Sequence, residues 1–219
     1  SNVTQTITAS SEFTLALFLN VIRNFPKAIE NISNNLWRVN ENEMRGREVS
    51  CLSVGIVGLG RIGGNLARYL DSMGATINYF DPNVDNETYE KHKDLNKMLS
   101  ICDAVFTCVH VAEDTIDMVN SDFIDNMKDN SYYINTSRGE IVVEQDLVVA
   151  LQTGKIKAAG VDVIRNENSD KIDDNLLVQY ASKNNNLIIT PHIAGLSTDS
   201  ESKAQIAAFE MIFNFLKNE

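Results

Sequence analysis

Short apolar runs alternate along this chain with segments in which apolar residues recur every three or four positions. The runs are rich in valine, isoleucine, tyrosine and phenylalanine, as buried strands of a parallel sheet are. They lie at residues 53–57, 75–80, 104–109, 132–135, 158–163 and 187–190. Helical spacing predicts helices at residues 95–100, 115–119, 122–127, 144–152, 175–182 and 198–216, and Ser121 is the predicted N-cap of the helix at 122–127. This alternation predicts an α/β fold built on a doubly wound parallel sheet.

A long amphipathic helix is predicted before the first strand, at residues 10–37. Its apolar residues step by four along one face: Phe13, Leu17, Val21, Phe25 and Ile29. Ser10 or Ser11 is the predicted N-cap, and Pro26 is predicted to kink the helix or divide it in two. The pattern is equally that of an ordinary packed surface helix. A charged loop at residues 38–48 is predicted to follow.

Three glycines follow the first strand in the spacing G-x-G-x-x-G, at Gly58, Gly60 and Gly63. This pattern at a strand-to-helix turn provides a tight turn, close approach to a pyrophosphate and close helix packing. The second strand ends in Asp81, where a Rossmann unit places the carboxylate that binds the adenosine ribose. Asp81 also stands before Pro82, where aspartate commonly forms turns. Strand, glycines, helix, strand and acid in this order predict a dinucleotide site.

In doubly wound sheets, ligands bind beyond the carboxyl ends of the strands. Four residues with useful chemistry stand at or near predicted strand ends: His110, Arg138, Asp162 and His192. These residues are therefore candidates for the site.

Composition excludes several classes of protein. The 219 residues are enough for one large domain or two small ones, and 43% hydrophobic with 22% charged residues is typical of globular proteins. The formal net charge of −11 argues against a nucleic-acid partner, which needs clustered lysine and arginine. The apolar stretch at residues 13–19 is too short to cross a bilayer and lacks a cationic leader. We therefore expect neither a membrane segment nor a signal peptide.

The cysteines and histidines predict no metal site. Cys51, Cys102 and Cys108 lack the spacing of metal ligands, and the chain has only three histidines. An odd number of cysteines on or beside buried strands predicts reduced thiols and a cytoplasmic protein.

Several motifs in order along the chain resemble the D-isomer-specific 2-hydroxyacid dehydrogenases, which include phosphoglycerate, glycerate, formate and D-lactate dehydrogenases. The motifs lie at residues 54–67, 108–110, 135–142, 159–163 and 190–195. The similarity runs from about Thr8 to the C-terminus. It implies a Rossmann fold, NAD as cofactor and oxidoreductase activity on a small 2-hydroxy or 2-oxo acid.

The resemblance implies three catalytic residues. Arg138 matches the arginine that clamps the substrate carboxylate, a task that suits a guanidinium fork. His192 matches the histidine that takes and returns the hydroxyl proton, and Glu167 matches the acid beside that histidine. Each residue also has a plainer interpretation: a surface arginine in a turn, a structural histidine and a solvated loop acid. Glu167 precedes Asn168, where the family has a proline.

The resemblance also implies cofactor-binding positions beyond the glycines and Asp81. Arg61 and Ile62 match positions over the pyrophosphate, whereas Thr136, Ser137 and Asp162 match positions near the nicotinamide half. The remaining implied cofactor-binding residues are Val109, His110, Thr115 and Gly195. Asp81 predicts NAD rather than NADP, because a carboxylate repels a 2′-phosphate.

Three departures from the family pattern stand out. Ala112 replaces a usual proline in a loop about two residues short, and Phe13 replaces a histidine common beside Glu12. Residues 8–37 resemble the first linker helix and a dimerisation arm, and residues 198–217 resemble the second linker helix. Nothing in residues 1–219 resembles the family's separate substrate lobe, so we expect a fragment consisting of the NAD-binding domain. By resemblance we also expect a homodimer.

Two other classes of protein share the glycine loop. A non-catalytic NAD-binding interaction module needs the glycines and Asp81 but not Arg138, Glu167 and His192. A methyltransferase uses a similar loop for its own cofactor but leaves Arg138 and His192 unexplained. The three retained residues favour the dehydrogenase.

Overall fold

A parallel sheet forms the centre of the fold in the computed structural model, which describes residues 7–39 and 41–217. Residues 1–6, 40, 218 and 219 of the predicted domain lie outside the described residues. Within the described part the strands are β1 (Ser53–Val57), β2 (Thr76–Phe80), β3 (Glu90–Lys91), β4 (Ala104–Thr107), β5 (Ser131–Asn135), β6 (Ile156–Val161) and β7 (Leu187–Ile189). Their order across the sheet is β3-β2-β1-β4-β5-β6-β7, and every pair is parallel. The predicted doubly wound sheet is confirmed.

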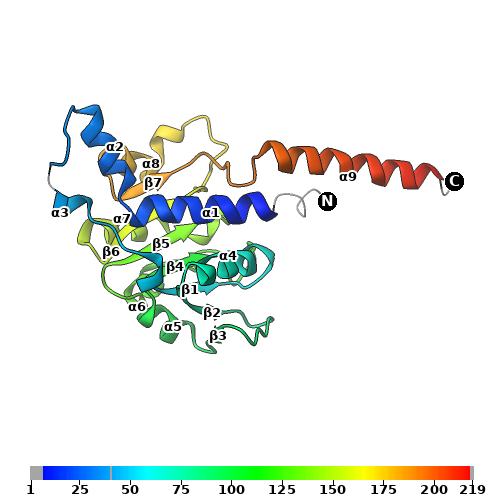
Figure 1. Cartoon of the computed structure of the whole chain (residues 1–219), viewed down its shortest axis with the longest axis horizontal. Helices are drawn as coiled ribbons and strands as arrows, with labels where there is room; N and C mark the ends of the chain where they lie inside the picture. Colours follow the sequence, from blue (N-terminus) through cyan, green and yellow to red (C-terminus); the bar gives the residue numbers. More distant parts are fainter. Residues whose placement is uncertain (1–6, 40, 218–219) are drawn as a thin grey trace.

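Helices connect the strands and cover both faces of the sheet (Figure 1). The α-helices are α1 (Ile7–Ile22), α2 (Phe25–Ser33), α3 (Glu41–Met44), α4 (Arg61–Ser72), α5 (Leu95–Ile101), α6 (Ser121–Asn126), α7 (Glu144–Thr153), α8 (Leu176–Ala181) and α9 (Thr198–Lys217). Short 3₁₀ turns are η2 (Val49–Cys51), η3 (Gly139–Ile141) and η4 (Ile172–Asp174). Helix α7 ends at Gly154, whose φ of 79° lies in the left-handed region that glycine readily adopts.

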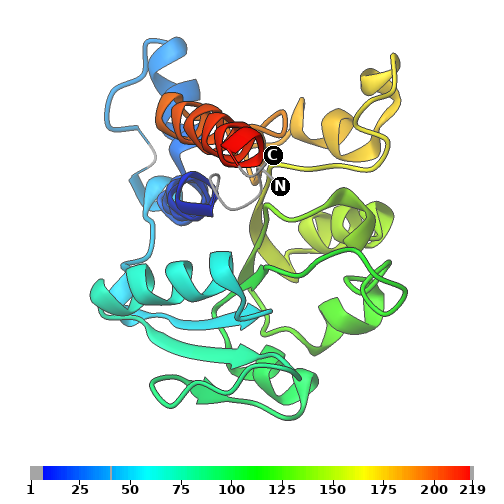
Figure 2. The ribbon, with the colours of Figure 1, turned by 90° about the vertical axis from the view of Figure 1, so that its right-hand side faces the viewer.

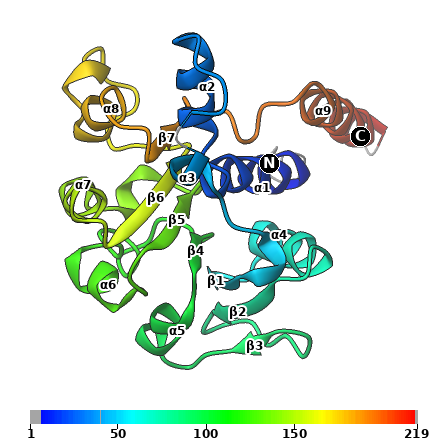
Figure 3. The same ribbon diagram turned by 60° about the vertical axis from the view of Figure 1, so that its left-hand side comes forward.

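The core has two layers, one on each face of the sheet. Helices α1 and α4 pack on one face, and α5 to α8 cover the other (Figures 2 and 3). On the first face the rings of Phe18 and Phe106 meet edge to face, with 4.9 Å between centroids. Gly160 lets α1 approach β6 closely, because a methyl group there would lie 2.8 Å from Leu17 and 2.9 Å from Val21. Helix α1 is therefore seated directly on the sheet.

The first predicted helix differs from the structure in its start and in its buried face. Helix α1 begins at Ile7, before the predicted caps, and the Ser11 hydroxyl instead donates to the Ile7 carbonyl within the helix. The predicted division occurs, but at Asn24, which has a left-handed φ of 53°. Pro26 then lies in the first turn of α2, where its missing N–H costs no hydrogen bond. Phe25 and Ile29 are therefore 49% and 62% exposed, off the predicted apolar face.

Two further local predictions are wrong. Residues 115–119 form turns rather than a helix, because Asp117 takes a left-handed φ of 56° and Val119 pairs with Val142 in a β-bridge. The N-cap of α6 is Asn120, not Ser121, because the Asn120 side chain accepts from the Phe123 N–H at 3.1 Å. The charged loop at residues 38–48 contains α3, and the polar segment after Asp81 contains β3.

Helix α9 extends away from the sheet (Figure 1). Its exposed apolar side chains include Phe209 and Phe213. In residues 7–39 and 41–217, no helix has the length and apolar character needed to span a bilayer. The same residues contain no cluster of three histidine, cysteine or acidic side chains arranged to hold a metal ion.

Candidate functional site

The three glycines of the loop between β1 and α4 differ in their geometry. Gly58 has a φ of 91°, which side chains rarely tolerate. A methyl group on Gly63 would lie 2.1 Å from the Gly58 carbonyl oxygen, so helix and turn touch directly. A methyl group on Gly60 would meet nothing within 4 Å. Open space therefore adjoins the N-terminus of α4, which begins with Arg61 and Ile62 and whose first N–H groups attract an anion.

Asp81 lies against this glycine loop. Its Oδ2 accepts from the Leu59 N–H at 2.9 Å, and its Oδ1 accepts from the Asn83 N–H at 2.8 Å. The second bond is the turn interaction expected of an aspartate before Pro82. The first joins the end of β2 to the loop after β1, so the carboxylate stands at the cradle that the glycines form. Its role toward a ribose stays a prediction.

The segment after β4 is closed by Thr115. The Thr115 hydroxyl donates to the His110 carbonyl at 2.6 Å and accepts from the Ala112 N–H at 2.8 Å. His110 is exposed at the end of this strand and Val109 is half-buried. The shortened loop is thus an ordered turn beside the glycine loop, where a methyl group on Gly58 would meet Val109 at 2.9 Å.

The loop after β5 presents Arg138 at the surface. Buried Asn135 fixes this loop, because its Oδ1 accepts from the Ser137 N–H and its Nδ2 donates to the Arg138 carbonyl, both at 2.9 Å. Ser137 donates through its hydroxyl to the Thr107 carbonyl at the end of β4. A methyl group on Gly139 would lie 2.1 Å from the Ile164 backbone, so the loop packs tightly on the next crossover. The Arg138 guanidinium is exposed and donates to the Ser137 carbonyl.

His192 and Glu167 come together at the ends of β7 and β6. The His192 Nδ1 and the Glu167 Oε1 are 2.6 Å apart, and their side chains are 42% and 30% exposed. His192 has a left-handed φ of 53°, an uncommon backbone for a residue with a side chain. A histidine held by a carboxylate through one nitrogen presents its other nitrogen for proton transfer.

Asp162 holds the loop that carries His192. It is 1% exposed, and its Oδ1 accepts from the Thr190 hydroxyl at 2.6 Å and from the Ile193 N–H at 3.0 Å. Its Oδ2 accepts from the Ala194 N–H at 2.7 Å, and its carbonyl accepts from the His192 N–H at 2.8 Å. The sequence places Asp162 at the cofactor, whereas these contacts show a carboxylate engaged by its own protein. The role of Thr190 as its hydroxyl donor was not predicted.

Three residues that the sequence did not single out hold the segment around Glu167: Arg165, Glu144 and Asn175. The Arg165 guanidinium donates to the carbonyls of Val142 and Glu140 at 2.7 Å. Glu144, only 9% exposed, accepts from the Arg165 N–H at 2.8 Å and from the Asn175 amide at 2.9 Å. The sequence offered only a weak signal for them: Glu144 is the first residue of the predicted helix at 144–152, and Asn175 is the first residue of the predicted helix at 175–182.

The predicted residues gather at one edge of the sheet. Because all strands are parallel, the segments that follow them lie along the same carboxyl edge. In order across the sheet, this edge carries Asp81, the glycine loop, the segment from Val109 to Thr115, the Arg138 loop, Asp162 with Glu167, and finally His192 with Gly195. The strand order reverses between β1 and β4, the point at which doubly wound folds bind dinucleotides.

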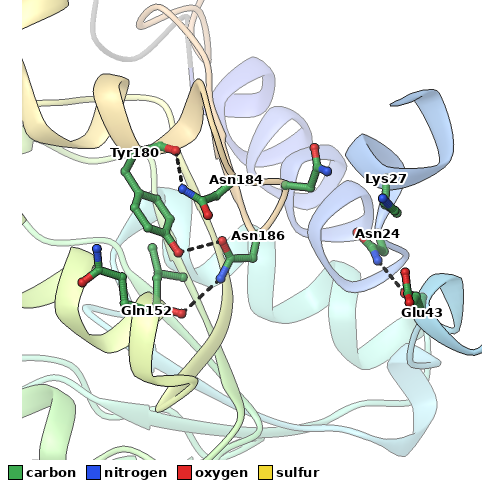
Figure 4. A pocket seen from close by; sticks show the side chains of 9 residues that line it. Asn24, Lys27, Glu43, Gln152, Tyr180, Asn184 and Asn186 are labelled. Atoms are coloured by element: carbon green, nitrogen blue, oxygen red, sulfur yellow. Dashed lines mark hydrogen bonds between the residues drawn. The ribbon is translucent and has the colours of Figure 1, made fainter. Parts of the chain in front are cut away.

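Two hollows differ in their relation to this edge. One of about 730 Å³ is lined by His192, Glu167 and Asp162 together with apolar side chains such as Ile172 and Ile189. Another of about 520 Å³ is lined by asparagines, Lys27 and Tyr180 (Figure 4). The second contains none of the predicted site residues, so the candidate site is the edge with His192.

The parallel sheet, glycine cradle and strand-end acid together define a dinucleotide-binding domain. Residues 15–194 match the family model for the D-isomer specific 2-hydroxyacid dehydrogenase, NAD binding domain. The chain belongs to this family. The model match covers most of the sequence and includes Arg138, Glu167 and His192.

Individual relatives agree with this assignment. The chain is 31% identical over 217 residues to a glyoxylate reductase of Korarchaeum cryptofilum, covering 96% of this chain and 63% of that protein. It is 31% identical to a hydroxypyruvate reductase of Blautia hydrogenotrophica, covering 94% and 64%. A D-lactate dehydrogenase structure from Aquifex aeolicus, complexed with NAD and lactic acid, superposes with a TM-score of 0.88 at 27% identity, covering 97% and 67%. The chain therefore spans less than two thirds of the length of these curated relatives.

Proposed function

We propose that this protein is an NAD-dependent dehydrogenase that transfers a hydride between C2 of a D-2-hydroxy acid and nicotinamide. The observation that carries the proposal is the His192–Glu167 pair, at 2.6 Å, on the same sheet edge as the glycine cradle. A domain that only binds the cofactor needs the glycine cradle. It does not need a histidine that is held by a carboxylate at the end of β7, two strands from the Arg138 loop.

Arg138 binds the substrate carboxylate in this proposal. Its guanidinium is exposed at the end of β5, and its loop is fixed by Asn135 and Ser137. A planar guanidinium matches a carboxylate with two parallel hydrogen bonds, which also sets the orientation of C2.

His192 moves the proton. Its Nδ1 faces the Glu167 carboxylate, so Nε2 takes the proton from the substrate hydroxyl during oxidation and returns it during reduction. Glu167 stabilises the imidazolium that forms. Asp162 fixes the backbone around His192 through its bonds to Thr190 and Ala194. When bound, NAD supplies the nicotinamide carbon that accepts or returns the hydride.

The residues at the cradle fit NAD. The open space at Gly60 would admit a pyrophosphate close to the start of α4, and the contact of Asp81 with the glycine loop supports a role for its carboxylate in binding the ribose hydroxyls. We propose that Arg61, Ile62 and the segment from Val109 to Thr115 line the same cofactor site. Fluorescence titration of the wild-type chain with NADH and NADPH tests this assignment: NADH should bind more tightly.

The Asp81→Ala variant sharpens that test. It should weaken NADH binding and narrow the preference over NADPH, because the carboxylate that repels a 2′-phosphate is gone. Equal titration curves for the wild type and the variant with both nucleotides would remove the assignment.

The alternative is a non-catalytic NAD-binding interaction module. The His192→Ala variant of the full-length gene product separates the two, assayed with NADH and a panel of 2-oxo acids. An enzyme loses turnover and keeps its NADH affinity. A wild type that binds NADH but reduces no member of the panel would favour the module.

We further propose that residues 1–219 form one NAD-binding domain, with residues 8–37 as a linker helix and dimerisation arm and residues 198–217 as a second linker helix. Apolar side chains exposed from α2 onward support a homodimer: Phe25, Ile29, Ile32 and Trp37. Sedimentation analysis should give twice the chain mass.

Free Cys51, Cys102 and Cys108 support a cytoplasmic location, where thiols stay reduced.

A further inference from the structure

Helix α1 touches the Arg138 loop through a pair of hydroxyl groups. The Oγ1 atoms of Thr14 and Thr136 lie 2.7 Å apart, although 122 positions separate them in the sequence. Thr14 is 1% exposed, and Thr136 is half-buried directly after β5. This contact joins a helix that precedes the sheet to the loop that presents Arg138.

The direction of the hydrogen bond follows from counting protons. The Thr14 hydroxyl also lies 2.7 Å from the Ser10 carbonyl oxygen, which has no proton, so Thr14 is the donor there. A hydroxyl has only one proton to donate. Thr136 must therefore donate to Thr14, and its own oxygen keeps acceptor capacity alone. A ligand that reaches Thr136 meets an acceptor and has to bring an N–H or O–H group.

The contact also completes the anchoring of the loop. Asn135 binds the backbone of Ser137 and Arg138, and Ser137 binds the end of β4. Thr136 is the remaining side chain before Arg138, and it binds α1. Asn135 thus fixes the loop internally, whereas Ser137 ties it to β4 and Thr136 ties it to α1.

Helix α1 is a rigid support for this anchor. Gly160 lets Leu17 and Val21 lie directly on β6, and both side chains are buried. Thr14 stands one helical turn before Leu17 on the buried side of the helix. The Thr14 hydroxyl therefore links the Arg138 loop to a helix whose position on the sheet is fixed.

We infer that Thr14 is a positioning residue that acts through Thr136: it orients the Thr136 hydroxyl as an acceptor and fixes the Arg138 loop. The inference rests on the proposed function, in which Arg138 binds the substrate, and on the family resemblance, which puts Thr136 near the nicotinamide half of the cofactor. The structure does not require a polar residue at Thr14 for the fold of α1, since its other partner is a carbonyl of the same helix.

The test compares two buried hydroxyls of α1 in the 219-residue chain. Thr14→Val removes the hydroxyl that meets the loop, and Thr14→Ser retains it. Ser11→Ala is the matched control, because the Ser11 side chain is fully buried and donates to the Ile7 carbonyl within the helix. Thr136→Val and the Thr14→Val/Thr136→Val double variant complete a thermodynamic cycle.

Two readouts separate positioning from a merely structural role. Thr14→Val should speed hydrogen exchange at the amides of residues 136–139 and weaken NADH binding about three- to tenfold, the effect of one hydrogen bond. Thr14→Ser should restore both values. The double variant should bind NADH no more weakly than Thr136→Val alone, because Thr14 acts through Thr136. Thermal unfolding of every variant reports the shared effect on stability.

Three outcomes overturn the inference: unchanged exchange and affinity in Thr14→Val, equal effects in Ser11→Ala, or full additivity in the cycle. Failure of the wild type to bind NADH would instead refute the proposed cofactor site. In that case the exchange measurement on residues 136–139 still tests the anchor itself, so the two failures are distinguishable.

Discussion

The Nδ1 atom of His192 lies 2.6 Å from the Oε1 atom of Glu167, although the two residues are 25 positions apart. A carboxylate only accepts hydrogen bonds, so the hydrogen between these atoms belongs to the imidazole nitrogen. The neutral ring of His192 therefore carries its proton on Nδ1 and keeps a lone pair on Nε2. This is the tautomer that a general base at Nε2 requires.

Imidazole nitrogen shifts measured by NMR test this tautomer. In the wild-type chain at a pH at which the ring is neutral, the His192 Nδ1 should have the shift of a protonated nitrogen and Nε2 that of an unprotonated one. In Glu167→Ala the acceptor is gone, and the ring should shift toward the mixture seen in free histidine. Exposed His110 provides an internal reference, since its tautomer should be the same in both proteins. Identical His192 spectra in the two proteins would contradict the assignment.

Asp162→Asn should destabilise the protein by about 2–4 kcal/mol, because an amide group replaces one oxygen of a buried, fully engaged carboxylate. The three donors to that carboxylate come from Thr190, Ile193 and Ala194, and an amide nitrogen accepts from none of them. Urea unfolding measures the change. Asp170→Asn, at an exposed position of the same connection between β6 and α8, is the control and should leave the midpoint unchanged. Equal unfolding midpoints for both variants would show that the hydrogen bonds to the Asp162 carboxylate do not stabilise the fold.

Alanine substitution should mainly lower stability at Gly63 and mainly lower NADH affinity at Gly60. A methyl group at Gly63 would lie 2.1 Å from a backbone oxygen, so Gly63→Ala should lose about 1–3 kcal/mol of stability or more. A methyl group at Gly60 meets open space and should change stability by less than about 1 kcal/mol. It should nevertheless weaken NADH binding at least about tenfold, because it would occupy the proposed approach to the pyrophosphate. Thermal unfolding and NADH titration of both variants provide the comparison. A stable Gly60→Ala protein with wild-type affinity would place the pyrophosphate elsewhere.

The sequence predicted the sheet and the residues at its edge because both depend on local patterns. Apolar runs predicted six of the strands. Because these strands are parallel, the polar residues that follow them lie at one common edge of the sheet. What it missed depends either on where a helix begins or on contacts between distant segments. Ser11 looked like a cap, but its hydroxyl bonds within a helix that begins earlier. The bonds of Asp162 and the contact of Thr14 with Thr136 appear only when the chain is folded.

Acid should weaken the protein through Asp103. Burial disfavours its charged form, but hydrogen bonds from Lys128 and the Ser53 N–H outweigh burial and lower the pKa of Asp103. A lowered folded-state pKa adds stability above the ordinary aspartate value, and this stability is lost as the pH falls below about 4. Asp103→Asn should therefore cost about 1 kcal/mol at pH 7 and nearly nothing near pH 2. Urea unfolding at several pH values measures the convergence.

Asp85→Asn is the matched control for this pH dependence. Lys91 likewise lowers the pKa of Asp85, chiefly through a side-chain hydrogen bond, but the Asp85 side chain is 93% exposed. Exposed pairs of this kind contribute little to stability. If the free energy of unfolding depends on pH in the same way for Asp103→Asn and the wild type, the hydrogen bonds of Asp103 do not stabilise the fold.

Asn186, directly before β7, joins helices α7 and α8 at the hollow shown in Figure 4. Its Oδ1 accepts from the Tyr180 hydroxyl of α8 at 3.0 Å, and its Nδ2 donates to the Leu151 carbonyl of α7 at 3.2 Å. Tyr180→Phe should cost about 1 kcal/mol and Asn186→Ala about 1–3 kcal/mol, because the latter leaves two partners unpaired. The double variant should lose less than the sum, since the two residues share one bond. Asn185→Ala, whose amide binds Glu30 at the surface, should change stability by less than about 0.5 kcal/mol. Additive losses in urea unfolding would refute the coupling between Tyr180 and Asn186.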